Sequence, residues 1–248
     1  QETTERLDAE LKVVGEIQRS LLPRDLPEIP GLTIETSYET AQRAGGDYFD
    51  LFELDDGRWG ILIADVSGHG TPAAVLMAIT HAIAHAYAGP HPPTAGFLEY
   101  VNNRLTETYT NGSGAFVTAF YAVYDPRTLT LDYTSAGHPP PRLRRGHKII
   151  ALDQGGGLPL GLFPDQHYGN ATITLEPDDI LVLYTDGLTE ARQPAGPLFG
   201  IRRIDNALIN GQPSCTGVIQ TILQTVNQFT RNAPLSDDRT LIGIRVNQ

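Results

Sequence analysis

The chain opens with a helical pattern of apolar residues. Apolar side chains recur near the N-terminus at steps of three and four, at Leu7, Leu11, Val14, Ile17 and Leu21. This spacing places them along one face of an amphipathic helix. Residues that cannot continue a helix follow, at Pro23, Pro27 and Pro30. We therefore predict a regulatory helix and proline-rich linker over residues 1–30, followed by a separate globular domain over residues 31–248.

From residue 32 onward the pattern changes to short apolar or alternating runs, which are typical of strands. We predict strands over residues 32–38, 48–54, 59–64, 116–124, 129–134, 171–175, 180–184 and 241–246. Helical patterns cover residues 72–87, 95–109, 201–209 and 216–229. Runs of strands grouped apart from pairs of helices favour an α+β fold, with antiparallel sheets packed between helical layers, over a doubly wound parallel sheet.

Charge and cysteine content restrict the class of protein. The net charge of −11 and the pI near 5.0 argue against a general nucleic-acid binder, because that work needs a basic face. The only cysteine, Cys215, cannot form an internal disulfide, which fits a reducing, cytoplasmic location. No apolar run approaches the roughly 20 residues of a membrane-spanning helix. The chain does not begin with methionine, so we expect an upstream domain, outside this sequence, that acts as a sensor.

Acidic residues mark the ends of several predicted strands, at Asp47, Asp65, Asp186 and the pair Asp237–Asp238. Converging carboxylates repel one another unless a cation neutralises them. An oxygen-only ligand set, with no cysteine or histidine cluster, favours Mg²⁺ or Mn²⁺ over Zn²⁺. Two such ions about 4 Å apart activate a bridging water for in-line attack on phosphorus, which predicts phosphate-ester hydrolysis.

Each aspartate taken singly is more simply interpreted as a turn or cap residue. The whole set favours a site, because glycines accompany the motifs at Gly45, Gly46, Gly68, Gly70 and Gly187. Glycine lets backbone approach a ligand closely or adopt a positive φ.

Five motifs, in order, resemble the metal-dependent protein phosphatases of the 2C type, in the bacterial branch named for sporulation stage II protein E. They are AGGDYFD (44–50), ADVSGHG (64–70), AGHPP (136–140), YTDGLTE (184–190) and DDRT (237–240). The resemblance covers about residues 14–246. It implies a four-layer α-β-β-α sandwich, with two antiparallel sheets flanked by helices, and a centre of two Mn²⁺ or Mg²⁺ ions.

The resemblance also implies ligand roles. Asp65 would bridge both ions with help from the Val66 carbonyl, and Asp47 would serve one ion. Asp186 and Asp237 would serve the other. Asp238 stands where other branches carry asparagine, so the choice between Asp237 and Asp238 stays open. In the eukaryotic branch a histidine follows the bridging Asp-Gly, but the Ser67-Gly68-His69 spacing differs, and no general-acid role is carried onto His69.

Members of this branch dephosphorylate phosphoserine or phosphothreonine on anti-sigma-factor antagonists, which makes such a protein the expected substrate. Two alternatives stay open: a catalytically silent module that binds the same partner, and a binuclear hydrolase of small phosphate esters. The presence of all four acidic positions favours an enzyme over the silent module.

Three further features have competing interpretations. We expect His138 to be structural rather than to orient the site. A basic run, comprising Arg142, Arg144, Arg145, His147 and Lys148, fits a solvated hairpin around Gly146 better than a surface for a phosphorylated partner. The N-terminal helix either caps the sheet or acts as a switch, and its apolar stripe suits pairing in a homodimer.

Overall fold

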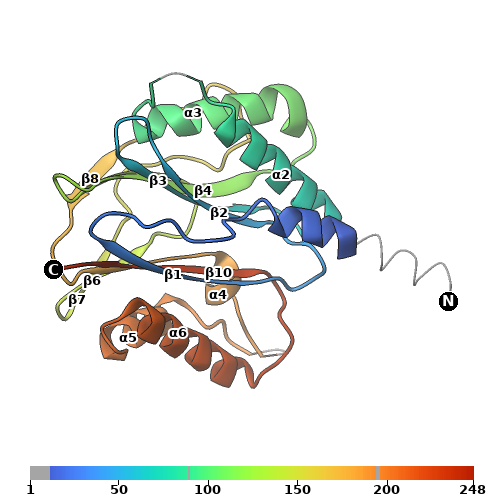
Figure 1. Ribbon diagram of the computed structural model, residues 1–248. Helices are drawn as coiled ribbons and strands as arrows, with labels where there is room; N and C mark the ends of the chain where they lie inside the picture. The colour runs from blue at the N-terminus through green and yellow to red at the C-terminus, as the bar shows by residue number, and fades with distance from the viewer. Residues whose placement is uncertain (1–11, 89, 194–195) are drawn as a thin grey trace.

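The computed structural model describes residues 12–88, 90–193 and 196–248 (Figure 1). Within them the strands form two five-stranded antiparallel sheets. The first has the order β1 (Leu32–Glu39), β10 (Arg239–Val246), β9 (Ile180–Tyr184), β6 (Arg142–Arg145) and β7 (Lys148–Ala151). The second has the order β2 (Asp47–Glu53), β3 (Trp59–Val66), β4 (Val117–Asp125), β5 (Thr130–Ala136) and β8 (Ala171–Thr174).

Helices cover the outer face of each sheet (Figure 1). The second sheet carries α2 (Thr71–His85) and α3 (Thr94–Leu105), which continues into a π-helical turn at Thr106–Thr110. The first sheet carries α5 (Ile201–Asn210) and α6 (Cys215–Thr230), and a short helix α4 (Asp186–Thr189) follows β9. The described part of the chain is therefore the predicted four-layer α+β sandwich. None of its helices is long and apolar enough to cross a membrane.

Strand β9 shows why the fold needs near-continuous apolar strands. Leu181 and Leu183 point into the large core between the sheets, whereas Ile180, Val182 and Tyr184 belong to the smaller core under α5 and α6. All five side chains are buried, because both faces of this strand are covered. Burial of apolar area on both faces is the main force that joins the layers.

The N-terminal helix meets the domain through a polar contact as well as an apolar one. Residues 12–19 are helical, and Leu7 and Leu11 lie outside the described residues. Ile17 is 59% exposed, whereas Val14 is partly buried and Leu21 packs against the large core, so the described part of the apolar stripe lies only partly against the domain. The face that meets the domain carries Gln18, whose Nε2 donates to the Gly45 carbonyl (2.8 Å) and whose Oε1 accepts from the Gly45 amide (3.0 Å). A buried polar side chain therefore joins this helix to the loop between β1 and β2.

Candidate metal centre

The end of the sandwich where β2 and β3 meet carries the first two predicted aspartates. Asp47 and Asp65 are directly paired across these strands. Asp47 is buried, and its Oδ2 accepts hydrogen bonds from the hydroxyls of Thr185 (2.7 Å) and Thr240 (2.6 Å). Both threonines belong to the opposite sheet or its margin, so these bonds close the two sheets around Asp47 and fix the orientation of its carboxylate.

The structure brings the remaining aspartates to the same end. Burial raises the pKa of Asp65, and the nearby carboxylates raise it further, in the order Asp47, Asp186, Asp237 and Asp238. Burial also raises the pKa of Asp186, followed by repulsion from Asp237. For Asp47, burial raises the pKa despite its two hydroxyl donors. A divalent cation among these oxygens would remove the repulsion, so the donor set fits Mg²⁺ or Mn²⁺.

Asp237 and Asp238 are adjacent in sequence but have different surroundings. Asp238 is buried, and its two oxygens accept from the backbone amides of Ala41 (2.8 Å) and Gly46 (2.7 Å). Asp237 is exposed and accepts from the Asp238 amide (2.9 Å). The carboxylate of Asp238 therefore holds the β1–β2 loop in place, whereas Asp237 lies at the surface beside the acidic group.

The glycines near these aspartates allow close backbone approach. A Cβ on Gly187 would collide with the Asp238 carbonyl, and one on Gly46 would come within 2.8 Å of the Val66 carbonyl. Val66 also donates its amide to the Gly46 carbonyl (3.3 Å). Gly68 and Gly70 take positive φ values of 92° and 74°. Side chains at Gly46 and Gly187 would push apart the segments that carry the carboxylates, whereas at Gly68 and Gly70 a side chain would strain the backbone.

His138 lies between the two sheets beneath the acidic group. It is fully buried, and burial lowers its pKa to about 3, so the ring is neutral. Its Nε2 contacts the Tyr184 carbonyl (3.1 Å), which can only accept; this nitrogen therefore carries the hydrogen. Its Nδ1 accepts from the Thr118 hydroxyl (3.0 Å). These bonds link β4 to the end of β9 and support a structural role.

Arginines of the basic run form ion pairs with acidic residues of the same domain. Arg142 binds Asp205 on α5 through two hydrogen bonds of 2.7 and 2.8 Å. Arg145 forms ion pairs with Asp179 (2.6 Å) and Glu176 (2.9 Å). The run forms the predicted hairpin of β6 and β7, and these arginines hold that hairpin against its neighbours.

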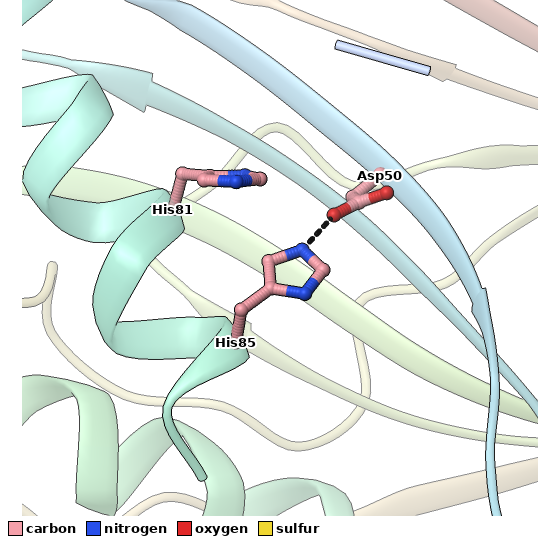
Figure 2. Close-up of side chains that lie close together, drawn as sticks. All are labelled: Asp50, His81 and His85. Atoms are coloured by element: carbon pink, nitrogen blue, oxygen red, sulfur yellow. Dashed lines mark hydrogen bonds and ion pairs between the residues drawn. The ribbon is translucent and has the colours of Figure 1, made fainter. Parts of the chain in front are cut away.

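The structure also brings together two histidines away from the acidic group, which the sequence analysis did not predict. His81 and His85 on α2 lie together beside Asp50 on β2 (Figure 2). Their spacing of four residues within a predicted helix was the available signal, because such residues share a helix face. The missing information was which strand residue faces them.

A hollow of about 650 Å³ lies next to the acidic group, lined by residues 41–44 and 69–71. His69 stands at its rim, exposed, with its Nδ1 accepting from the Gln42 amide nitrogen at 3.1 Å. The loops that line this hollow also lead into Asp47 and follow Asp65. The hollow thus gives access to this end of the sandwich.

Comparison with known proteins identifies relatives along most of the chain. A family model described as stage II sporulation protein E (SpoIIE) matches residues 55–247. The phosphoserine phosphatase RsbU of Bacillus subtilis (strain 168) is 30% identical over 246 residues, covering 97% of this chain and 71% of RsbU. Protein IcfG of Synechocystis sp. is 26% identical over 260 residues, covering 95% of this chain. The chain spans 41% of IcfG, less than half the length of that relative.

Solved structures share the fold. The SiaA-PP2C domain of Pseudomonas aeruginosa superposes with a TM-score of 0.82 at 23% identity, covering 98% of both chains. The RsbU and RsbW domains of Rv1364c from Mycobacterium tuberculosis match with a TM-score of 0.72 at 25% identity, covering 92% of this chain and 63% of that one. With the family match over residues 55–247 and the identity to RsbU, these likenesses show that the chain belongs to the stage II sporulation protein E family of PP2C-type phosphatases.

Proposed function

We propose that this domain is a metal-dependent protein phosphatase that hydrolyses phosphoserine or phosphothreonine. The observation that carries the proposal is the gathering of carboxylates from β2, β3, α4 and the approach to β10 at one end of the sandwich, where burial and then repulsion between carboxylates raise the pKa of Asp65, Asp186 and Asp237. Such an arrangement is unfavourable without a cation and suits two-ion phosphoryl chemistry. The relative RsbU, named a phosphoserine phosphatase, supports the same reaction.

The proposed ligands follow from their positions. Asp65 would contact both ions, with Asp47 and the Val66 carbonyl on one side and Asp186 and Asp237 on the other. Two Mn²⁺ or Mg²⁺ ions would supply an activated water and neutralise charge on the phosphoryl group when bound. Thr185 and Thr240 both donate to Oδ2 of Asp47, and these two bonds fix the orientation of its carboxylate. Asp238 positions the Gly46 backbone rather than serving as a principal ligand.

The substrate we propose is a phosphorylated anti-sigma-factor antagonist in the cytoplasm. A phosphorylated segment would enter by the hollow that residues 41–44 and 69–71 line, which opens beside the carboxylates. The solved relative that carries RsbU and RsbW domains in one chain supports a phosphatase of this branch acting in partner switching. The partner itself would be recognised by its phosphoryl group together with the surface around this hollow.

Metal removal is the direct test of the proposed reaction. The purified chain should hydrolyse a phosphoserine protein in Mn²⁺ or Mg²⁺, and EDTA should abolish turnover, because the oxygen ligands alone provide no nucleophile. Initial rates with a phosphoprotein, an aryl phosphate and a panel of phosphorylated metabolites measure this. Full activity after exhaustive chelation would contradict the mechanism. Binding of the phosphoprotein without turnover would favour a silent module, and turnover of metabolites alone would favour a small-ester hydrolase.

We further propose that the N-terminal helix couples an upstream sensor, or a second copy of the chain, to the metal centre. Gln18 supports this role because it holds Gly45, two residues from Asp47, through a reciprocal pair of hydrogen bonds. Val13 and Ile17 support it from the other side of the helix, where both are more than half exposed and free to meet a partner. The helix would thus connect an apolar outer contact with a polar inner one.

Substitutions on the two faces separate these contacts. Gln18→Ala should weaken metal binding and lower turnover about tenfold, because leaving the buried Gly45 groups unpaired costs about 1–3 kcal/mol. Val13→Glu and Ile17→Glu should instead reduce self-association and leave the rate of the isolated domain unchanged. Analytical ultracentrifugation and metal-dependent rates measure both effects. If all three variants match the wild type in association, metal affinity and rate, the helix is only a cap.

A further inference from the structure

A group of metal-ligating side chains lies outside the acidic centre, between α2 and β2 (Figure 2). One atom from each of Asp50, His81 and His85 lies within 4.8 Å of the other two. Nε2 of His85 approaches Asp50 Oδ2 to 2.5 Å, and the two imidazole centroids are 4.4 Å apart. We propose that these three side chains form a second metal site, which takes a nitrogen-preferring divalent ion such as Zn²⁺.

This site is distinct from the carboxylate centre. Successive side chains of a strand point to opposite faces, so Asp50 and Asp47 project from opposite faces of β2. Asp47 bonds to Thr185 and Thr240 between the sheets, whereas Asp50 contacts the helix layer through His85. Three residues along a strand also separate their backbones by about 10 Å. An ion at one position would therefore share no ligand with the other.

The ligand types explain the expected metal. Two imidazoles and a carboxylate suit Zn²⁺, Co²⁺, Ni²⁺ or Cu²⁺, whereas Mg²⁺ prefers oxygen alone. Histidines four residues apart on one helix can both reach a single ion, and a carboxylate from another element supplies a third ligand. The side chain of Asp50 is 10% exposed and that of His85 is 46% exposed. The site thus has a buried base and a side open to water, which can provide the fourth ligand.

Surrounding groups already position these ligands. The Tyr48 hydroxyl donates to Asp50 Oδ2 (2.7 Å) and contacts His81 Nδ1 (2.9 Å). Because that hydroxyl has a single hydrogen, His81 Nδ1 donates to it. Partners of this kind fix the orientation and tautomer of a ligating imidazole. A hollow of about 160 Å³, lined in part by His85 and Glu53, gives an ion access from solvent.

The alternative is a hydrogen-bonded network with no metal function, in which His85 is protonated and paired with Asp50. The hydrogen bond to Asp50 raises the pKa of His85, whereas burial lowers that of His81. The metal-free protein thus holds one neutral imidazole and one proton between the other ring and the carboxylate. An ion would replace that proton with modest movement of the exposed His85 ring. The bound ion would then join α2 to β2 through metal–ligand bonds. The hydrogen-bonded network joins the two elements only through weaker bonds.

Cobalt binding tests the site in the presence of the carboxylate centre. The 248-residue chain is titrated with Co²⁺ in a large excess of Mg²⁺. The Mg²⁺ occupies the oxygen ligands of the carboxylate centre. The visible absorption of Co²⁺ reports binding at a four-coordinate site that contains nitrogen. We expect one Co²⁺ per chain, retained in Asp65→Asn. His81→Gln, His85→Gln and Asp50→Asn should each weaken binding at least about a hundredfold, since each removes a direct ligand. His91→Gln is the matched control, because His91 lines the same hollow outside the cluster.

Two further measurements guard against loss of folding. Circular dichroism checks each variant, and His85→Gln is the mildest because its ring is the most exposed of the cluster. Zinc-edge anomalous scattering from wild-type crystals locates the ion without any substitution. An anomalous peak between α2 and β2, with a Zn²⁺-dependent rise in melting temperature that His85→Gln loses, supports the site. Cobalt binding that disappears in Asp65→Asn, or that survives unchanged in folded His81→Gln and His85→Gln, overturns it.

Discussion

Asp65→Asn and Asp186→Asn are each expected to lower phosphatase turnover by at least about a hundredfold, because both are proposed metal ligands and losing a direct carboxylate ligand removes an ion or displaces the activated water. Asp65 has the largest expected effect, since the carboxylates of Asp47 and Asp186 both act on it. The measurement is kcat for a phosphoserine protein across a Mn²⁺ titration, which distinguishes weaker metal binding from a slower reaction at saturation.

The metal-free form of Asp65→Asn should be more stable than the metal-free wild type. The pKa of Asp65 is raised in the fold, chiefly by burial and then by neighbouring carboxylates. A raised folded-state pKa contributes stability that is complete below about pH 4 and is lost as the pH rises toward the raised value. Asparagine has no charge to repel its neighbours. The stability advantage of Asp65→Asn in EDTA should therefore grow between about pH 4 and pH 8.

A matched control separates the loss of turnover and metal binding from a general response to aspartate substitution. Asp132→Asn changes an aspartate on β5 whose partner is the Thr172 hydroxyl, away from the acidic group. It should leave turnover and metal affinity unchanged. If Asp65→Asn and Asp186→Asn both kept near-normal rates with metal bound, the ligand assignment would be wrong, whatever the stability data showed.

The layers and most aspartate positions were predictable because their signals are local. The apolar runs of Ile61–Ala64 and Ile180–Tyr184 identify buried strands, and Asp65 and Asp186 come within two residues of the ends of these runs. The short helix after β9 gave no periodic signal, because four residues span barely one turn. Local pattern thus predicts which residues reach the end of the sandwich.

Features that depend on distant packing were not predictable. The helix face that meets the domain carries Gln18, a polar residue. Its hydrogen-bond partner, Gly45, lies in a loop 27 residues away. The cluster of Asp50 with His81 and His85 depends on which face of β2 lies under α2. Apolar periodicity does not report such contacts, because hydrogen bonds between elements are set by tertiary geometry. The arginines of the β6–β7 hairpin show the same limit, since Asp205 lies 63 residues from Arg142.

The choice between Asp237 and Asp238 is of the same kind. Asp237 is exposed, whereas the adjacent Asp238 is buried. The amides that donate to Asp238 belong to Ala41 and Gly46, 197 and 192 residues away. The sequence alone gives both residues the same chemistry. In the structure, both oxygens of Asp238 already accept hydrogen bonds from backbone amides. We therefore expect opposite effects on stability and metal binding from the asparagine substitutions at the two positions.

Asp237→Asn should lower metal affinity and turnover at least about a hundredfold while leaving the metal-free protein as stable as the wild type or more so. Asp238→Asn should instead destabilise the protein by about 2–4 kcal/mol, because an amide group would replace one of two oxygens that accept backbone hydrogen bonds in a buried position. For a domain of this size that corresponds to a fall in melting temperature of roughly 2–4 °C for each kcal/mol.

Chemical unfolding in EDTA separates the two aspartates, because loss of a metal ligand does not destabilise a protein that holds no ion. Asp238→Asn should remain destabilised in EDTA, since its bonds to Ala41 and Gly46 exist without metal. Asp237→Asn should be less stable than the wild type only when metal is added. A folded Asp238→Asn of normal stability that fails to bind metal, together with an Asp237→Asn that binds and turns over normally, would reverse the assignment and make Asp238 the ligand.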